Sequence, residues 1–159
     1  MPPKLNVIHF LAYGSVVSTY VLIVIGGYVS ATGSGLACPD WPLCQGQIVP
    51  QLRGPVLIEY THRIFALVVG VFIASTMVYS LLKLGRERTV VALSTASFLL
   101  LVAQVILGMV TVRTELDPLV ATAHLGLASG VFALVLANAL TVRALVIQPS
   151  FARTLPKTN

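Results

Sequence analysis

The segment from Glu59 to Arg63 places three ionisable side chains at the start of a long apolar stretch, in the order Glu59-Tyr60-Thr61-His62-Arg63. Residues 64–82 then carry no charge and are numerous enough to cross a bilayer. Ionisable groups at or inside a membrane span are costly, so they indicate a functional site and require partners. His124, early in the last apolar segment, is the partner we expect for His62, because both should lie at a similar membrane depth. Two facing imidazoles in a small helical bundle are typical of axial haem ligands.

The histidine pair also has a cofactor-free interpretation, in which the two rings form an interhelical hydrogen bond. Glu59 and His62 are three residues apart, so they share one face of the predicted helix. Arg63 is rotated from His62 by about 100°, and it could either reach a haem propionate or anchor the helix among lipid headgroups. His9 should lie near the opposite membrane surface, and we expect no ligand role for it.

Composition indicates the elements that must position these residues. The chain is 57% hydrophobic and 9% charged, which lies outside the range of soluble domains. Its apolar runs predict an all-α fold, an integral membrane four-helix bundle that forms a single domain over residues 1–159. The predicted spans are about 8–29, 60–84, 90–112 and 119–147. The first run is too long for a signal-peptide core, so we keep it as a span.

The distribution of Lys and Arg orients these spans. One side of the predicted topology carries seven basic residues, namely Lys4, Lys83, Arg86, Arg88, Arg143, Arg153 and Lys157. The other side carries three, namely Arg53, Arg63 and Arg113. The positive-inside rule therefore predicts a multi-pass protein of the cell membrane, with both termini in the cytoplasm and the first and third loops outside. The net charge of +5 then reflects contact with an anionic lipid bilayer, and we expect no nucleic-acid partner.

Both cysteines of the chain lie in the one long predicted loop, residues 30–58, on the outer side. An exterior loop can be oxidising, so Cys38 and Cys44 are candidates for a disulfide, with prolines bending the segment between them. The alternative is a pair of free thiols packed beneath a lid. Their spacing fits neither a Cys-x-x-Cys redox motif nor covalent haem attachment, and two thiols without a nearby histidine make a poor zinc site.

The sequence resembles the haem A synthases in motifs that occur in the same order along nearly the whole chain. The motifs are Thr32-Gly33-Ser34-Gly35-Leu36-Ala37-Cys38-Pro39-Asp40-Trp41-Pro42-Leu43-Cys44-Gln45-Gly46, then Glu59-Tyr60-Thr61-His62-Arg63, and Gln104-Val105-Ile106-Leu107-Gly108 with His124-Leu125-Gly126 downstream. The resemblance implies an oxidoreductase that converts haem O to haem A by oxidising the C8 methyl group to a formyl group.

The resemblance also implies roles for individual residues. By position, His62 and His124 would be ligands of haem iron near the outer surface, and Glu59 would be the carboxylate that the reaction requires. Cys38 and Cys44 would form the loop disulfide. The substrate would be haem O, the cofactor haem b, and an electron acceptor or donor of unidentified kind would be a further partner.

The sequence departs from the family's pattern in its length. Typical members have eight helices in two similar halves, usually with one half for the substrate haem and the other for a haem b cofactor. This chain resembles the amino-terminal half, which carries the glutamate and the cysteines. Because oxidation of haem needs an electron sink beyond the substrate, we expect copies of the chain to form a homo-oligomer.

Two other functions are open at this stage. A b-type bis-histidine cytochrome for membrane electron transfer would explain both histidines and the topology, but it leaves Glu59 without a task. A cofactor-free scaffold protein would need the disulfide only to stiffen the outer loop.

Overall fold

The computed structural model describes residues 3–154, with side chains for residues 6–145. Its elements are α1 (Pro3–Ala31), the short 3-10 helix η1 (Ser34–Leu36), α2 (Gly54–Lys83), α3 (Arg88–Arg113) and α4 (Pro118–Thr154). Among the described residues, 4 helical segments are long and apolar enough to cross a membrane: Asn6–Ala31, Gly54–Lys83, Arg88–Arg113 and Pro118–Leu145. The prediction of an all-α, four-span membrane protein is confirmed, and the described part of the chain contains no strand.

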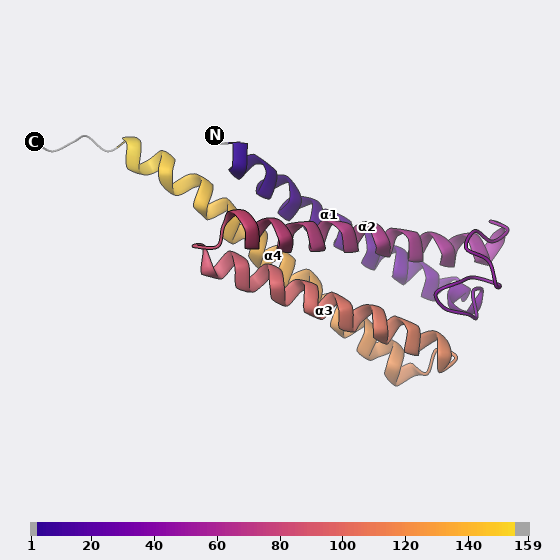
Figure 1. Ribbon diagram of the computed structural model, residues 1–159. Coiled ribbons are helices and arrows are strands. Elements are labelled where there is room, and N and C mark those ends of the chain that lie inside the picture. The colour runs from indigo at the N-terminus through magenta and orange to yellow at the C-terminus, as the bar shows by residue number, and fades with distance from the viewer. Residues whose placement is uncertain (1–2, 155–159) are drawn as a thin grey trace, which may run out of the picture.

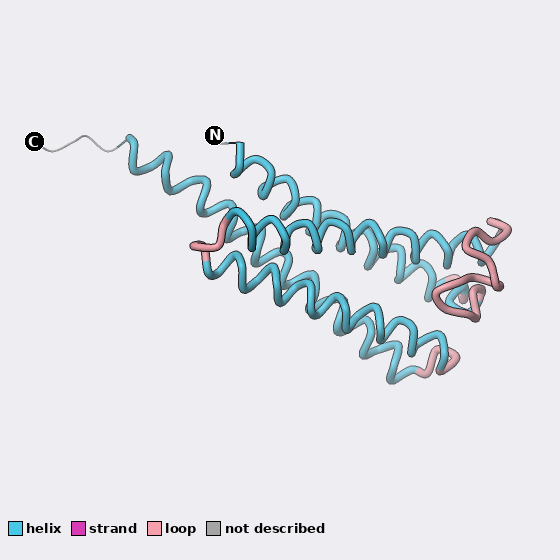
Figure 2. Tube along the Cα trace, in the orientation of Figure 1, coloured by secondary structure: helices cyan, strands magenta, loops and turns pink. Residues whose placement is uncertain are grey.

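The long helices form two antiparallel hairpins (Figure 1). The first hairpin consists of α1 and α2, joined by a long loop, and the second consists of α3 and α4, joined by a tight turn. Figure 2 shows that the loop after α1 and the turn after α3 lie at one end of the bundle, which we call the loop end. The start of α1 and the end of α4 lie toward the other end (Figure 1), so α2 and α4 run parallel.

Helix α2 begins at Gly54 and not at Tyr60, where the predicted span starts. Pro55 lies in its first turn, where the fixed φ of proline is favourable and its missing N–H costs nothing. Val56, Leu57 and Ile58 are already apolar, so the helix includes an apolar turn that the predicted span left out. The earlier start places Glu59 in the second turn of α2 and His62 in the third, whereas the predicted span began one residue after Glu59.

Buried side chains join the two hairpins from the middle of the bundle to the end opposite the loop end. One hydrophobic cluster contains Ile8, Ala12, Val90, Ala139 and Val142. The other contains Val69, Ile73, Leu101, Val131 and Val135. Hydroxyl contacts supplement these clusters, at 3.1 Å between Ser15 and Thr76 and at 2.6 Å between Ser80 and Ser94. Such polar contacts between helices stabilise membrane bundles, in which lipid removes the hydrophobic driving force for association.

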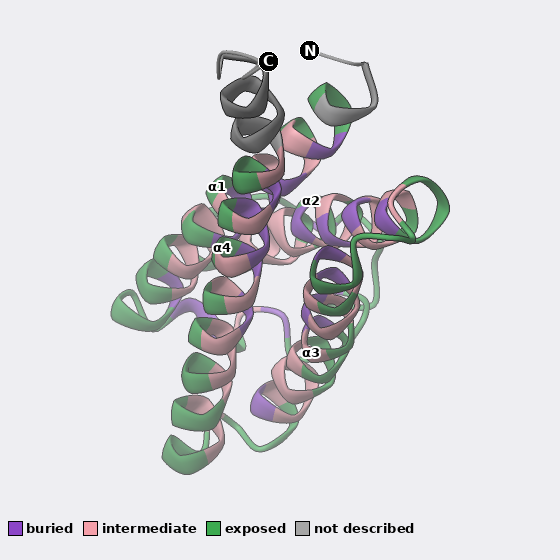
Figure 3. Cartoon of the chain, turned by 90° about the vertical axis from the view of Figure 1, so that its left-hand side faces the viewer, coloured by how far each residue is buried: buried purple, intermediate pink, exposed green. Residues whose placement is uncertain are grey.

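The half of the bundle toward the loop end has no comparable core among the described residues. The buried positions of α4 begin at Val131, and residues 118–130 are all intermediate or exposed. Figure 3 shows this as buried positions confined to the upper part of α4. The two hairpins diverge toward the loop end (Figure 1). They touch again between the loop and the turn, where a Cβ added at Gly35 would lie 3.2 Å from Leu116 Cδ2.

The basic residues divide between the ends of the bundle as the sequence indicates. Arg53, Arg63 and Arg113 belong to the loop end. Lys83, Arg86 and Arg88 flank the turn at the opposite end, and Arg143 lies in α4 toward that end. Lys4, Arg153 and Lys157 lie outside the residues whose side chains are described. The side of the membrane that each end faces stays a prediction.

Candidate functional site

His62 and His124 come from different hairpins and lie near each other in the loop-end half of the bundle. The two rings are close enough to interact electrostatically. Both side chains are partly buried. His9, by contrast, lies early in α1, where its ring stacks on Tyr13 with the ring centroids 4.6 Å apart. The structure therefore brings together the two histidines paired from the sequence and leaves the third apart.

Each of the paired histidines packs against a glycine of the other helix in its hairpin. A Cβ added at Gly26 of α1 would lie 3.2 Å from His62 Cε1, and one added at Gly108 of α3 would lie 3.0 Å from His124 Cε1. Both distances are shorter than ordinary van der Waals contact. The missing side chains of Gly26 and Gly108 thus make the space that the two imidazoles occupy.

Few hydrogen bonds within the described residues occupy the ring nitrogens of His62 and His124. The Nδ1 atoms of His62 and His124 are buried and have no hydrogen-bond partner among the described residues. Gln104 Nε2 lies 3.3 Å from His124 Nε2 and can only donate, so the contact is a hydrogen bond in the tautomer that leaves His124 Nε2 without a hydrogen. Buried polar atoms without partners are unfavourable, so they indicate a missing interaction. Two imidazoles from diverging hairpins, in a region without its own apolar core, form a donor set that fits haem iron.

Glu59 is buried at the same end of the bundle and is 5% exposed. Its Oε1 accepts a hydrogen bond from Arg63 Nε at 2.9 Å, one helical turn further along α2. A buried carboxylate requires a charged or hydrogen-bonding partner, and Arg63 supplies both. Glu59 therefore shares a helix with His62 but is held by Arg63.

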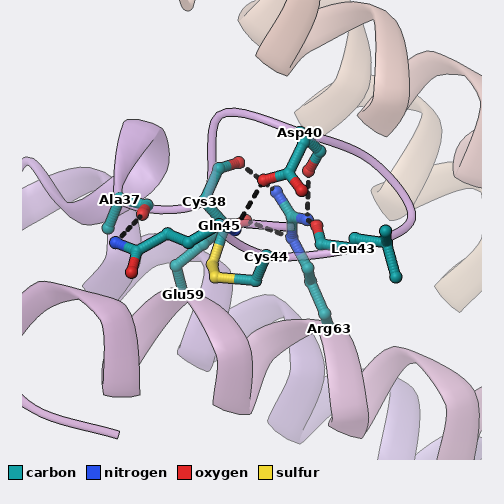
Figure 4. A network of polar contacts seen from close by, with 8 residues as sticks. All are labelled: Ala37, Cys38, Asp40, Leu43, Cys44, Gln45, Glu59 and Arg63. Carbon is teal, nitrogen blue, oxygen red and sulfur yellow. Dashed lines mark hydrogen bonds and ion pairs between the residues drawn. A yellow bond between two sulfur atoms is a disulfide. The ribbon is translucent and has the colours of Figure 1, made fainter. Parts of the chain in front are cut away.

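The rest of the Arg63 guanidinium binds the loop between α1 and α2 (Figure 4). Nη1 donates to the carbonyl oxygens of Asp40 at 2.7 Å and Leu43 at 2.8 Å, and Nη2 donates to that of Cys38 at 2.7 Å. Neither interpretation of Arg63 from the sequence, propionate contact or headgroup anchor, included these contacts. Within the described contacts, one N–H of Nη2 is left for a further acceptor.

The loop that Arg63 binds is closed by the predicted disulfide between Cys38 and Cys44. Both cysteines are buried, at 0% and 1% exposure. The Asp40 carboxylate accepts hydrogen bonds from the backbone N–H groups of Gly46 at 2.7 Å and Gln45 at 2.6 Å. The bond from Gly46, followed by that from Gln45 and the positive charge of Arg63, lowers the pKa of Asp40 below its ordinary value.

Comparison with known proteins relates the sequence of the chain to one family. Residues 9–54 and 53–158 match the COX15-CtaA family, which is described as cytochrome oxidase assembly protein. The chain is 38% identical over 117 residues to the heme A synthase of Alkalihalophilus pseudofirmus, a match that covers 72% of this chain and 39% of the relative. It is 34% identical over 124 residues to the heme A synthase of Bacillus licheniformis, covering 77% of this chain and 41% of the relative.

A third relative gives the same result. The heme A synthase of Bacillus pumilus is 34% identical over 135 residues, which is 80% of this chain and 43% of the relative. The chain thus spans about two fifths of the length of the curated relatives it matches.

Proposed function

Because the chain belongs to the haem A synthase family, we propose that it takes part in converting haem O to haem A. Haem O would be the substrate, and the reaction would oxidise its C8 methyl group to a formyl group. The observation that carries this proposal is the buried carboxylate of Glu59 on the helix that presents His62, at the end of the bundle where His62 and His124 lie close together.

His62 and His124 are the residues that would hold the haem iron, one from each hairpin. Gly26 and Gly108 support this role because they let the rings lie tightly against the neighbouring helices. Haem, once bound, supplies the iron centre and the porphyrin methyl group at which oxidation takes place. The same pair of imidazoles would suit haem b as a resident cofactor.

Glu59 would act on the methyl group of a haem held by these histidines. Its carboxylate could stabilise positive charge that develops at the methyl carbon, or it could take a proton from an attacking water. Conversion of methyl to formyl requires two successive hydroxylations, each of which removes an electron pair from the carbon, and then loss of water. The electrons would pass to an acceptor of unidentified kind.

A b-type cytochrome is the second candidate, and the histidine pair is the observation that favours it. In that case haem would carry electrons between membrane partners and remain unaltered. This function needs both imidazoles but gives no role to a buried, Arg63-bound carboxylate.

Haem extraction followed by mass analysis separates these functions. The protein is purified from cells that also make haem O, and its bound haem is identified. We expect haem A or its hydroxylated intermediate. Haem B alone would favour the cytochrome, and the absence of any haem would favour a cofactor-free scaffold.

We also propose that the loop end faces the outside of the cell membrane and that copies of the chain associate. The orientation is supported by the distribution of Lys and Arg between the two ends. Association is supported by the single pair of adjacent histidines, because a substrate haem and a cofactor haem would need two pairs. Closed cyclic symmetry would be the simplest arrangement, and mass measurement in mild detergent would determine the number of copies.

A further inference from the structure

We propose that Arg63 is a positioning residue through which the disulfide-closed loop fixes the Glu59 carboxylate. The inference rests on the proposed function, because that function gives Glu59 its role in the reaction. It assigns Arg63 to the protein's own architecture and not primarily to a haem propionate.

The first support is the number of bonds made by one rigid group. The guanidinium is planar and presents its donors in a fixed fork, so the direction of one nitrogen determines the directions of the others. In Arg63 the two Nη atoms bind the loop, while Nε binds Glu59. Fixing the Nη atoms on the loop therefore fixes the point at which Glu59 Oε1 is held.

The second support is the position of the acceptors within the loop. The three carbonyl groups that bind Arg63 belong to Cys38, Asp40 and Leu43, all within the ring that the Cys38–Cys44 disulfide closes. Cys38 contributes both a disulfide sulfur and an acceptor carbonyl. A covalent ring limits how far these carbonyls can move apart in the folded loop (Figure 4).

The third support is burial. The side chains of Arg63 and Glu59 are 14% and 7% exposed, so water reaches neither of them freely. A buried charge that loses a partner is strongly destabilised, and the surrounding structure shifts to compensate. If the loop carbonyls moved, Arg63 would follow them, and Glu59 Oε1 would lose the position at which Arg63 Nε holds it.

The test uses the protein in detergent and six variants: Arg63→Gln, Arg63→Lys, Cys38→Ser with Cys44→Ser, Arg53→Gln, Glu59→Gln, and Glu59→Gln with Arg63→Gln. Arg53 is an exposed basic residue at the same end of the bundle, so its replacement controls for loss of one positive charge. Hydrogen exchange of the loop amides, the haem absorption spectrum and haem A formation are measured for each.

We expect loop amides such as those of Gln45, Gly46 and Gln47 to exchange roughly tenfold faster or more in both Arg63 variants and in the cysteine variant. Arg53→Gln should leave exchange unchanged. Haem absorption should persist in all variants, while haem A formation falls in all but the Arg53 control. In a Glu59→Gln background, Arg63→Gln should cause little further loss, because the residue acts through Glu59.

Three results would overturn the inference. Unchanged loop exchange in Arg63→Gln would show that the arginine does not hold the loop. Loss of haem absorption with a normally protected loop would make Arg63 a haem contact. Full recovery of protection and turnover in Arg63→Lys would show that charge alone suffices. If the unmodified protein makes no haem A, the proposed function fails, whereas the exchange measurements still decide whether Arg63 links loop and carboxylate.

Discussion

His124 lies so close to Gly108 that a Cβ added to the glycine would come within 3.0 Å of the imidazole Cε1. His62 repeats the relationship with Gly26, at 3.2 Å. In each hairpin, therefore, a histidine on the second helix packs against a glycine on the first helix. This correspondence supports a single site to which both hairpins contribute.

Replacing Gly108 by Ala should push the His124 ring away from its position and weaken haem binding. Overpacking of this kind costs about 1–3 kcal/mol, which corresponds to a loss of affinity of roughly five- to 150-fold. Gly26→Ala should act in the same direction but less strongly, because its distance is longer. Haem titration followed by absorption measures the effect.

The adjacent Gly27 provides a matched control, since a Cβ there would meet nothing within 4 Å. Gly27→Ala should bind haem as well as the unmodified chain. Equal affinity in all three alanine variants would mean that the glycines do not set the positions of the imidazoles.

Glu59→Gln keeps the shape of the side chain and removes its charge. Haem should still bind, because Glu59 is not one of the two proposed ligands. Haem A formation should fall by roughly 10²- to 10³-fold, which is typical when a charge-stabilising group is removed. Glu115→Gln removes an exposed carboxylate from the turn at the same end and should have no such effect. Undiminished turnover by Glu59→Gln would show that the charge of Glu59 is not needed for the reaction and that its role is structural.

Cys38 and Cys44 should resist alkylation until the protein is both unfolded and reduced, because they are bonded and buried. The chain has 2 cysteines, so any labelled cysteine belongs to this pair. In the chain-entropy model, closure of so short a loop contributes only about 2 kcal/mol. The Cys→Ser pair should therefore still insert into membranes, with a looser loop and weaker activity. Free alkylation of native, unreduced protein would contradict the disulfide.

Acidification should loosen the loop between α1 and α2 by protonating Asp40. The pKa of this carboxyl is held below the ordinary value of 3.8 in the folded loop, chiefly by the backbone bond from Gly46. Its contribution to stability is therefore complete above about pH 3.8 and is lost as the pH falls toward the folded pKa. Trp41 is the one tryptophan of the chain and adjoins Asp40, so its fluorescence reports the transition.

Asp40→Asn is the control for this titration. Its amide nitrogen cannot accept the second backbone bond, so the loop should be looser at neutral pH and should lack the acid transition below pH 3.8. An identical transition in both proteins would assign it to another group.

The sequence predicts the elements of this site better than their contacts. Uncharged apolar runs identify the four spans because a bilayer requires long apolar helices. The three-residue spacing of Glu59 and His62 predicts that they share a helix, since that relationship is local. The disulfide is predicted from the position of both cysteines in one long loop, which the sequence places outside the membrane.

Contacts between distant segments could not be predicted in the same way. Arg63 reaches Cys38, 25 residues away in sequence, only because the intervening loop folds back over α2. Gly108 is visible in the sequence as a small residue suited to helix packing, but no pattern indicates that His124 lies opposite it. Both contacts depend on how separate elements are packed together, which neither hydropathy nor spacing specifies.

The absorption spectra of His62→Ala, His124→Ala and His9→Ala test the two-histidine site most directly. Each protein is purified from cells that make haem O, and the low-spin haem bands are compared with those of the unmodified chain. Loss of either paired histidine should abolish or severely reduce these bands, because each is proposed to supply one ligand from its own hairpin. His9→Ala should leave them unchanged, since His9 stacks on Tyr13 early in α1. An unaltered low-spin spectrum from His62→Ala or from His124→Ala would contradict the site.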